Sequence, residues 1–140
     1  MPTRRETFSI ETKEELQAID ITDRVTRIVR ASGLKEGIAV VFVAGSTCAV
    51  AATESEPGLL ESDIPAALER LAPHDGRYAH NVGGGDANGH SHVRSTVLGS
   101  SVTLPFGEGK PLLGAWQHIV LFELDIRSRK REVVVQLVGE

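Results

Sequence analysis

The 140-residue sequence predicts one α+β domain, residues 1–140, with a mostly antiparallel β-sheet and two or three short helices. Three observations support this fold class. Helical periodicity is confined to short stretches, strand patterns gather towards the C-terminus instead of alternating with helices, and no repeat or linker divides the chain. A chain of this length buries about two-thirds of its unfolded surface, so one core is expected.

The N-terminal part is predicted to form a strand and then a helix. Residues 4–11 alternate polar and apolar side chains, which is typical of a half-buried strand. Apolar residues then recur at helical spacing within residues 21–29, and we expect Thr22 or Asp20 to be the N-cap and Gly33 to end the helix.

Two further strands and a second helix are expected in the middle of the chain. Residues 38–43 are continuously apolar and rich in β-branched side chains, so we predict a strand that is covered on both faces. A second apolar strand is expected at residues 48–53. A turn at residues 57–62 should then lead into a helix that is capped by Asp63 and ends near Pro73.

The C-terminal part reads as a series of strands separated by turn residues. The predicted strands are Val102–Phe106, Leu112–Leu113, Ile119–Asp125 and Glu132–Val138, with a turn at residues 107–111. Such a series favours antiparallel pairing, because short turns join neighbouring strands.

Composition excludes several classes of function. The chain has 15 basic and 19 acidic residues and a net charge of -4, which argues against nucleic acid as a partner. Cys48 is the only cysteine, so no intrachain disulfide forms, and the cytoplasm is the expected location. No apolar stretch is long enough for a membrane span or a signal peptide. The aromatic content of 4% predicts a core of small aliphatic residues that borrows burial from a neighbouring subunit.

A glycine-rich segment at residues 74–92 holds four of the five histidines and is where we expect chemistry. In extended chain, His90 and His92 would project to one side and could share a divalent ion with His80. Zinc is the first choice for this ion and magnesium the second. A competing interpretation places a helix between Asn88 and Gly99, which would turn the two rings apart unless the helix starts only after His90. Solvated loop histidines are the third alternative.

Other polar residues suggest specific roles. Arg94 is a permanent cation that could hold a phosphate group in two hydrogen bonds. Glu54 ends an apolar strand, where it is either an acid/base or metal-binding group or a solvated strand end. Trp116 and Gln117 either anchor the core or line a site that holds an aromatic ring.

Two features are interpreted as structural and not as parts of a functional site. Cys48 is expected to be a small buried residue rather than a nucleophile, because no basic residue lies near it in the sequence. The basic cluster at residues 127–131 is interpreted as a solvated turn between two strands.

Several segments, in this order, resemble the YjbQ-like family, whose members are similar to secondary thiamine-phosphate synthases. They are Val41–Val50, Glu54 with Pro57, Asn88–Arg94, Leu113–Ile119 and Arg131–Glu140. The resemblance covers nearly the whole chain and implies a homotrimer of α+β subunits with a metal held by histidines. It also implies a weak activity that joins a pyrimidine pyrophosphate to a thiazole phosphate and releases pyrophosphate.

The resemblance assigns roles to single residues. It implies catalytic roles for Glu54 and His92. Together with the polar pattern, it gives a substrate-binding set consisting of Ser46, Thr47, Asn88, Arg94, Trp116 and Gln117. Many members have a histidine where this chain has Gly45, and asparagines beside the glutamate that corresponds to Glu54. These differences place the chain in a Gly-Ser-Thr branch.

Two functions are therefore expected from the sequence. The first is a metal-dependent enzyme that acts on a small phosphorylated metabolite, as a thiamine-phosphate synthase does. The second is a trimeric binding protein that holds a phosphorylated metabolite or a metal ion without turnover.

Overall fold

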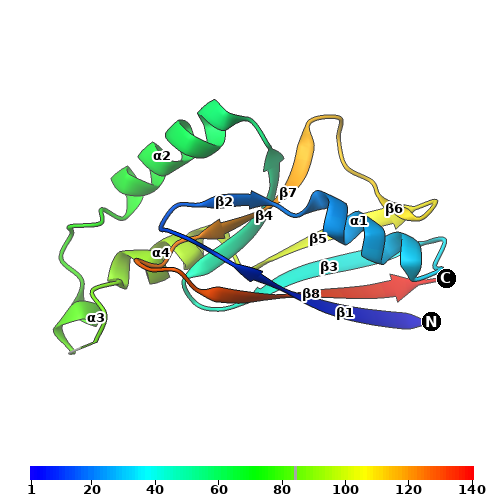
Figure 1. The fold of residues 1–140 in the computed structure, drawn as a ribbon, viewed down its shortest axis with the longest axis horizontal. Coiled ribbons are helices and arrows are strands. Elements are labelled where there is room, and N and C mark those ends of the chain that lie inside the picture. Colours follow the sequence, from blue (N-terminus) through cyan, green and yellow to red (C-terminus); the bar gives the residue numbers. More distant parts are fainter. Residues whose placement is uncertain (84) are drawn as a thin grey trace.

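The computed structural model describes residues 1–83 and 85–140 (Figure 1). The described strands are β1 (Thr3–Glu11), β2 (Ala18–Asp20), β3 (Glu36–Ala44), β4 (Cys48–Glu54), β5 (Ser101–Gly107), β6 (Lys110–Pro111), β7 (Gln117–Glu123) and β8 (Lys130–Gly139). The α-helices are α1 (Thr22–Ala31), α2 (Ile64–Leu71), α3 (Ala79–Val82) and α4 (Gly89–Leu98), and a π-helical turn, η1 (Leu59–Asp63), precedes α2.

The strands form two sheets in which every pair is antiparallel. One sheet has the order β1-β8-β3-β5-β6 and the other β2-β7-β4. The predicted α+β class with a mostly antiparallel sheet is confirmed. The described residues form four short helices besides η1, which is more than the two or three expected.

The main core lies between the two sheets and against α1. Val41 of β3, Val135 of β8 and Leu121 of β7 are fully buried there, together with Val25 and Val29 of α1. A second cluster lies on the other face of β4 and β7, where Val120 and Phe122 pack near Leu60 and Leu68 of η1 and α2. The three-stranded sheet is therefore covered on both faces, and α2 arches over it (Figure 1).

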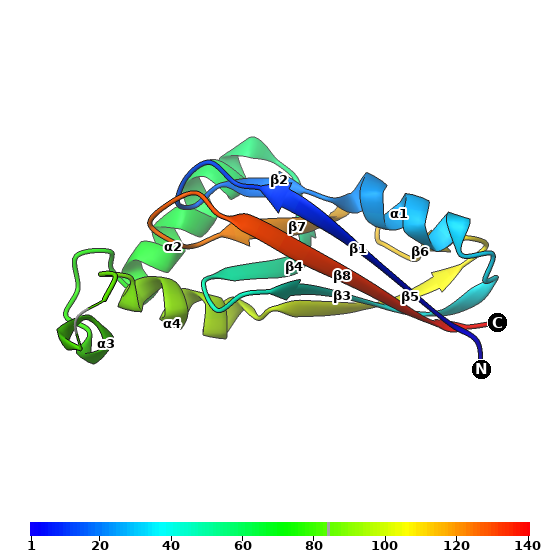
Figure 2. The same ribbon diagram turned by 60° about the horizontal axis from the view of Figure 1, so that its bottom comes forward.

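The outer face of the five-stranded sheet has no helix over it in the described chain (Figure 2). Ile38 and Phe42 of β3 and Val138 of β8 are 51%, 40% and 38% exposed on this sheet. The prediction that residues 38–43 are covered on both faces is therefore wrong within one subunit. Opposite faces alternate along a strand, so a continuous apolar run can bury one face and leave the other apolar and exposed.

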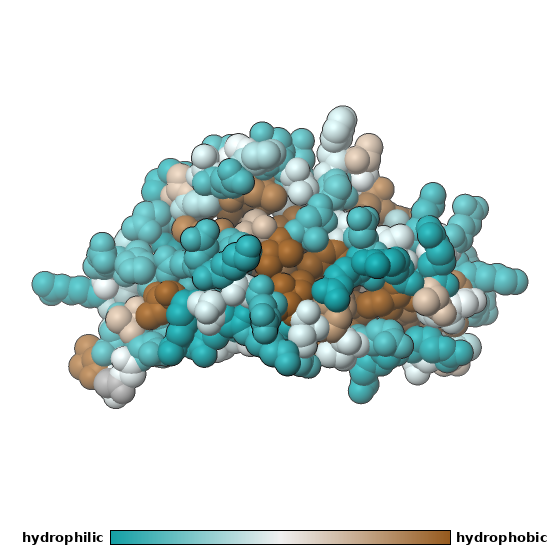
Figure 3. Space-filling model, in the orientation of Figure 1, coloured by the Kyte–Doolittle hydropathy of each residue, from teal (hydrophilic) through white to brown (hydrophobic). Residues whose placement is uncertain are grey.

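Figure 3 shows another side of the molecule, where apolar side chains gather in the middle and hydrophilic ones surround them. β1 and β8 run side by side over their full length, from Thr3 opposite Val138 to Glu11 opposite Lys130. This register brings the two chain ends together at one end of the sheet (Figure 2).

The helix boundaries correct some predictions and confirm others. Helix α1 ends as predicted near Gly33, whose φ of 75° is a conformation that glycine adopts without strain. The N-cap of α1 is Ile21 and not Thr22 or Asp20 as predicted, although Asp20 accepts hydrogen bonds from the Thr22 amide and hydroxyl. Asp63 does not cap α2, because η1 runs directly into that helix and Asp63 is already helical.

None of the described helices is long and apolar enough to cross a membrane.

Candidate functional site

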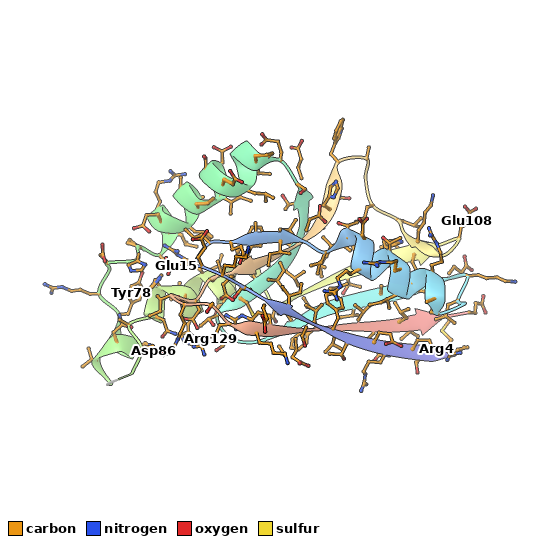
Figure 4. The ribbon with its side chains drawn as sticks, in the orientation of Figure 1. Arg4, Glu15, Tyr78, Asp86, Glu108 and Arg129 are labelled. Carbon is orange, nitrogen blue, oxygen red and sulfur yellow. The ribbon has the colours of Figure 1, made fainter. Side chains whose placement is uncertain are left out.

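A polar hollow of about 540 Å³ lies at the end of the molecule where the β3–β4 loop, the β7–β8 loop and helices α3 and α4 meet. Its polar lining is Ser46, Thr47, His80, Asp86, Asn88, His92, Asp125, Arg129, Lys130 and Arg131. Figure 4 shows Asp86 and Arg129 next to each other at this end. Three segments that are distant in sequence thus bring hydroxyls, imidazoles and cations to one concavity.

Two of the predicted histidines meet in the hollow. The ring centroids of His80 and His92 are 4.6 Å apart, with the rings tilted by 44°. The carbonyl oxygen of the Asn81 side chain accepts a hydrogen bond of 2.9 Å from the Gly89 amide, which ties α3 to the start of α4. This bond helps to place the two rings side by side.

The carboxylate of Asp125 organises the wall of the hollow. It is fully buried and accepts hydrogen bonds from the Thr47 hydroxyl at 3.1 Å, the Asn88 amide at 3.2 Å and the Arg129 Nε at 2.8 Å. Burial alone would raise the pKa of Asp125, but these bonds, with one from the Ile126 amide, lower it below its ordinary value. Asp125 is therefore an anion that fixes three lining side chains.

A buried ion pair lies behind the same wall. The Arg131 guanidinium donates to both carboxylate oxygens of Glu123, at 2.8 and 2.5 Å, and also to the carbonyl and hydroxyl of Thr47. Burial alone would lower the pKa of Arg131, but Glu123 raises it. The interpretation of residues 127–131 as a solvated turn is wrong for Arg131, which is 6% exposed and holds the β3–β4 loop in place.

Gly45 and Cys48 lie against this ion pair. A Cβ atom on Gly45 would be 2.7 Å from Arg131 Nη1 and 2.9 Å from Cys48 Sγ. A side chain at position 45 would therefore require Arg131 to move, which gives a physical reason for glycine here. Burial raises the pKa of the Cys48 thiol in spite of the nearby Arg131, so Cys48 is the buried, unreactive residue that we predicted.

His90 points away from the hollow. Helix α4 starts at Gly89, after Asn88, and its C-cap is Gly99, as in the competing interpretation. Residues two apart on a helix differ in direction by about 200°. The His90 ring is fully buried, with Nε2 2.8 Å from Glu15 Oε1. The proposed ligand set of His80, His90 and His92 is therefore not assembled around one ion within this subunit.

Arg94 does not line the hollow. It is fully buried, with Nε donating to the Ala72 carbonyl at 3.0 Å and Nη2 to Glu69 Oε2 at 2.8 Å. It ties α4 to the end of α2, and in this position it does not reach a ligand in the hollow. The phosphate-binding role predicted for Arg94 is not supported, because α4 turns its side chain into the protein.

Glu54, Trp116 and Gln117 lie at the opposite end of the three-stranded sheet. Glu54 pairs with Gln117 across β4 and β7, whereas Cys48 pairs with Glu123 beside the hollow. Six residues of strand separate these pairs, which is about 20 Å. Trp116 is 75% exposed, so it does not anchor the core of this subunit. Within one subunit, these three residues are remote from His92.

Sequence reasoning missed three functional candidates, namely Asp125, Arg129 and Lys130. A signal was present, because two acidic residues end an apolar strand and a basic run follows them after a short turn. Oppositely charged groups at the end of a buried strand tend to pair, and the pairing fixes how the cations are presented.

These features define a class of protein, namely a small α+β domain with a polar hollow between its loops. A family profile described as UPF0047 protein YjbQ-like matches residues 6–140, and the chain belongs to this family. A UPF0047 protein of Methanothermobacter thermautotrophicus is 40% identical over 131 residues, covering 94% of this chain and 89% of the relative. One from Archaeoglobus fulgidus is 38% identical, covering 92% and 97%.

Solved structures agree with the fold. A YbjQ-like protein of unknown function from Sulfolobus solfataricus has a TM-score of 0.88 and 37% identity, covering 99% of this chain and all of that one. An uncharacterised YjbQ/UPF0047 family protein from Clostridium acetobutylicum has a TM-score of 0.84 and 33% identity, covering 95% and 99%.

Proposed function

We propose that the hollow binds the phosphate group of a small phosphorylated metabolite. The observation that carries this proposal is the convergence of Arg129 and Lys130 with His80 and His92 on one concave surface. Cations and imidazole N–H groups are donors to phosphate oxygens, and the hydroxyl of Ser46 is a further donor at the same wall. Asp125 holds Arg129 in position before any ligand arrives.

Synthesis of thiamine phosphate is the reaction that the family resemblance suggests. A pyrophosphate leaving group gains negative charge as its bond to the pyrimidine unit breaks, and Arg129 and Lys130 could stabilise that charge. His92, beside His80, could supply a proton to the departing oxygen. Zinc, or magnesium, remains a proposed cofactor. The hollow offers two imidazoles and does not collect a three-residue ligand set from the described chain, so no step is assigned to the metal.

Binding without turnover is the second candidate function, and one observation favours it. Glu54, the proposed acid/base group, is separated from the hollow by the length of β4, about 20 Å. One isolated subunit therefore has a phosphate site without the expected carboxylate.

Association of three copies could bring a carboxylate to the hollow from another copy. The uncovered apolar face around Ile38, Phe42 and Val138 supports an interface between copies, and the number three comes from the family resemblance. In a trimer, the exposed edge with Glu54 and Trp116 of one copy could lie near the hollow of another. Phe42→Asp should then give monomers, while the wild type sediments as a trimer at micromolar concentration. A monomeric wild type in sedimentation equilibrium would rule out the trimer.

The phosphate site predicts a specific loss of affinity. Lys130→Ala, and separately Arg129→Ala, should weaken binding of inorganic pyrophosphate by about ten- to a hundredfold, because each removes one charge-assisted contact. Isothermal calorimetry measures this change, and Arg70→Ala, which removes an exposed arginine on α2, is the matched control. Equal affinity in all four proteins would refute the site.

The same proteins separate the two functions. Wild type incubated with the pyrimidine pyrophosphate and thiazole phosphate, with and without added zinc or magnesium, should form thiamine phosphate if the enzyme hypothesis holds. Pyrophosphate binding without any product would favour the binding protein instead.

A further inference from the structure

We propose that Glu15, His74 and His90 form a binding site for a divalent metal ion of the zinc class, separate from the hollow. One ligand atom from each residue lies within 4.8 Å of the other two. Glu15 Oε1 is 2.8 Å from His90 Nε2, and Glu15 Oε2 is 2.9 Å from His74 Nδ1. Two imidazoles and a carboxylate are a ligand set that zinc uses in proteins.

Binding of an ion requires the two contacts with Glu15, at 2.8 and 2.9 Å, to lengthen slightly. Ligand atoms at 2.0–2.2 Å from a tetrahedral zinc lie about 3.4 Å from each other. Such spacing falls within the 4.8 Å limit that the three atoms already meet. The His74 side chain is the most exposed of the three, so its rotation can supply part of this adjustment.

Burial is graded across the three ligands. The His90 side chain is fully buried, that of Glu15 is 20% exposed and that of His74 is 48% exposed. An ion can therefore enter from the side of His74, and water can occupy the fourth position. Figure 4 places Glu15 and Tyr78 at the same end of the molecule as the hollow.

Aromatic rings and hydrogen bonds surround the two imidazoles. The His74 ring lies 4.5 Å from the His90 ring and the Tyr78 ring lies 6.2 Å from it, measured between centroids. The Tyr78 hydroxyl donates to the Pro73 carbonyl at 2.7 Å, and the Glu69 carboxylate accepts the His74 amide hydrogen. These contacts pack against the His90 ring and hold the backbone segment that carries His74.

Hydrogen bonding without a metal is the competing explanation. Each imidazole can donate one N–H to one oxygen of Glu15, which satisfies the carboxylate but leaves Nδ1 of the buried His90 without a partner among the described residues. When Nε2 of His90 binds an ion, the ring proton must move to Nδ1, which is buried without a partner among residues 1–83 and 85–140. This proton shift opposes binding, so we expect micromolar affinity rather than that of a closed structural site.

The ion would join segments that are far apart in the chain. Glu15 lies between β1 and β2, His74 follows α2, and His90 is in the first turn of α4. Metal binding would therefore fasten the segment after α2 to the body of the protein. A bound ion should raise the melting temperature, because the unfolded chain does not hold these ligands together.

Cobalt titration of a double variant tests the proposal. His80→Ala with His92→Ala removes the imidazoles of the hollow, so that His74, His90 and His118 remain. This tag-free protein should bind one equivalent of Co²⁺ with visible absorption bands of low-coordinate cobalt, which Zn²⁺ then displaces. Adding His74→Ala or Glu15→Gln should weaken binding at least about a hundredfold, since even changes to outer contacts cost ten- to a hundredfold.

His118→Ala is the matched control, because His118 also pairs with a carboxylate, Asp20, at 2.7 Å but has no second imidazole in its cluster. This variant should keep the cobalt spectrum. The proposal is overturned if the double variant gives no cobalt bands, or if His74→Ala leaves the titration unchanged. Pyrophosphate binding at Lys130 is measured separately, so failure of one site does not decide the other.

Discussion

Replacing Arg131 with alanine is expected to lower the free energy of unfolding by about 3–5 kcal/mol, the range typical of a broken buried ion pair. The substitution leaves Glu123 fully buried without its cation, although the Thr12 hydroxyl still donates to it at 2.7 Å. It also removes one hydrogen bond from the Thr47 carbonyl and one from its hydroxyl, which keep their bonds to the Leu124 amide and to Asp125. Urea unfolding measures the loss, and pyrophosphate affinity should fall as the β3–β4 loop loosens.

Two comparisons make this prediction specific. Arg127→Ala breaks an ion pair with Asp86 that is about half exposed, and it should change stability by less than about 1 kcal/mol. Replacing both partners of the buried pair, by Arg131→Met with Glu123→Leu, should cost less than Arg131→Ala alone, because no charge is then left unpaired. Wild-type stability in Arg131→Ala would contradict the structural role of the pair.

Arg94→Ala is expected to destabilise the protein by about 2–4 kcal/mol, through loss of packing and loss of the bond to the buried Ala72 carbonyl. The contact with Glu69 adds little to this value, because that carboxylate is 55% exposed. Denaturant unfolding is the measurement, and Arg94→Met separates the two causes, since it keeps most of the volume and removes the donors.

The same variant separates the two roles of Arg94. The phosphate-binding role expected from the sequence predicts weaker phosphate binding by Arg94→Ala in a domain that stays folded, whereas the structure predicts lower stability and unchanged pyrophosphate affinity in the folded protein. A variant that is as stable as wild type but binds pyrophosphate poorly would restore the role assigned from the sequence.

Local patterns were enough to predict the elements that are long enough to show a regular spacing of apolar residues. Alternation at residues 4–11 identified β1, and apolar spacing at residues 21–29 identified α1. Strand β2 has three residues, which is too short to show a regular spacing, and it exists because it pairs with β7 about 100 residues later.

The cytoplasmic location stays a prediction.

The site was predicted less completely because it depends on side-chain directions that the sequence does not specify. The register of α4 decides that His92 faces the hollow while His90 and Arg94 face the interior. A shift of the helix start by one residue would have changed the directions of all three side chains. The basic run around Arg129 looked solvated because its partners, Glu123 and Asp125, are presented by a strand end whose burial only the fold reveals.

The register of β1 against β8 has a practical consequence for experiments. The Gly139 amide donates to the Pro2 carbonyl at 3.2 Å, so both chain ends lie at the far end of β8 from Lys130. Nine residues of strand separate them from the hollow, which is about 30 Å. A fluorophore, biotin or surface linker joined to either end would thus lie far from Lys130 and His92 on the same subunit. Immobilised protein should keep this concavity open to ligands that flow past it.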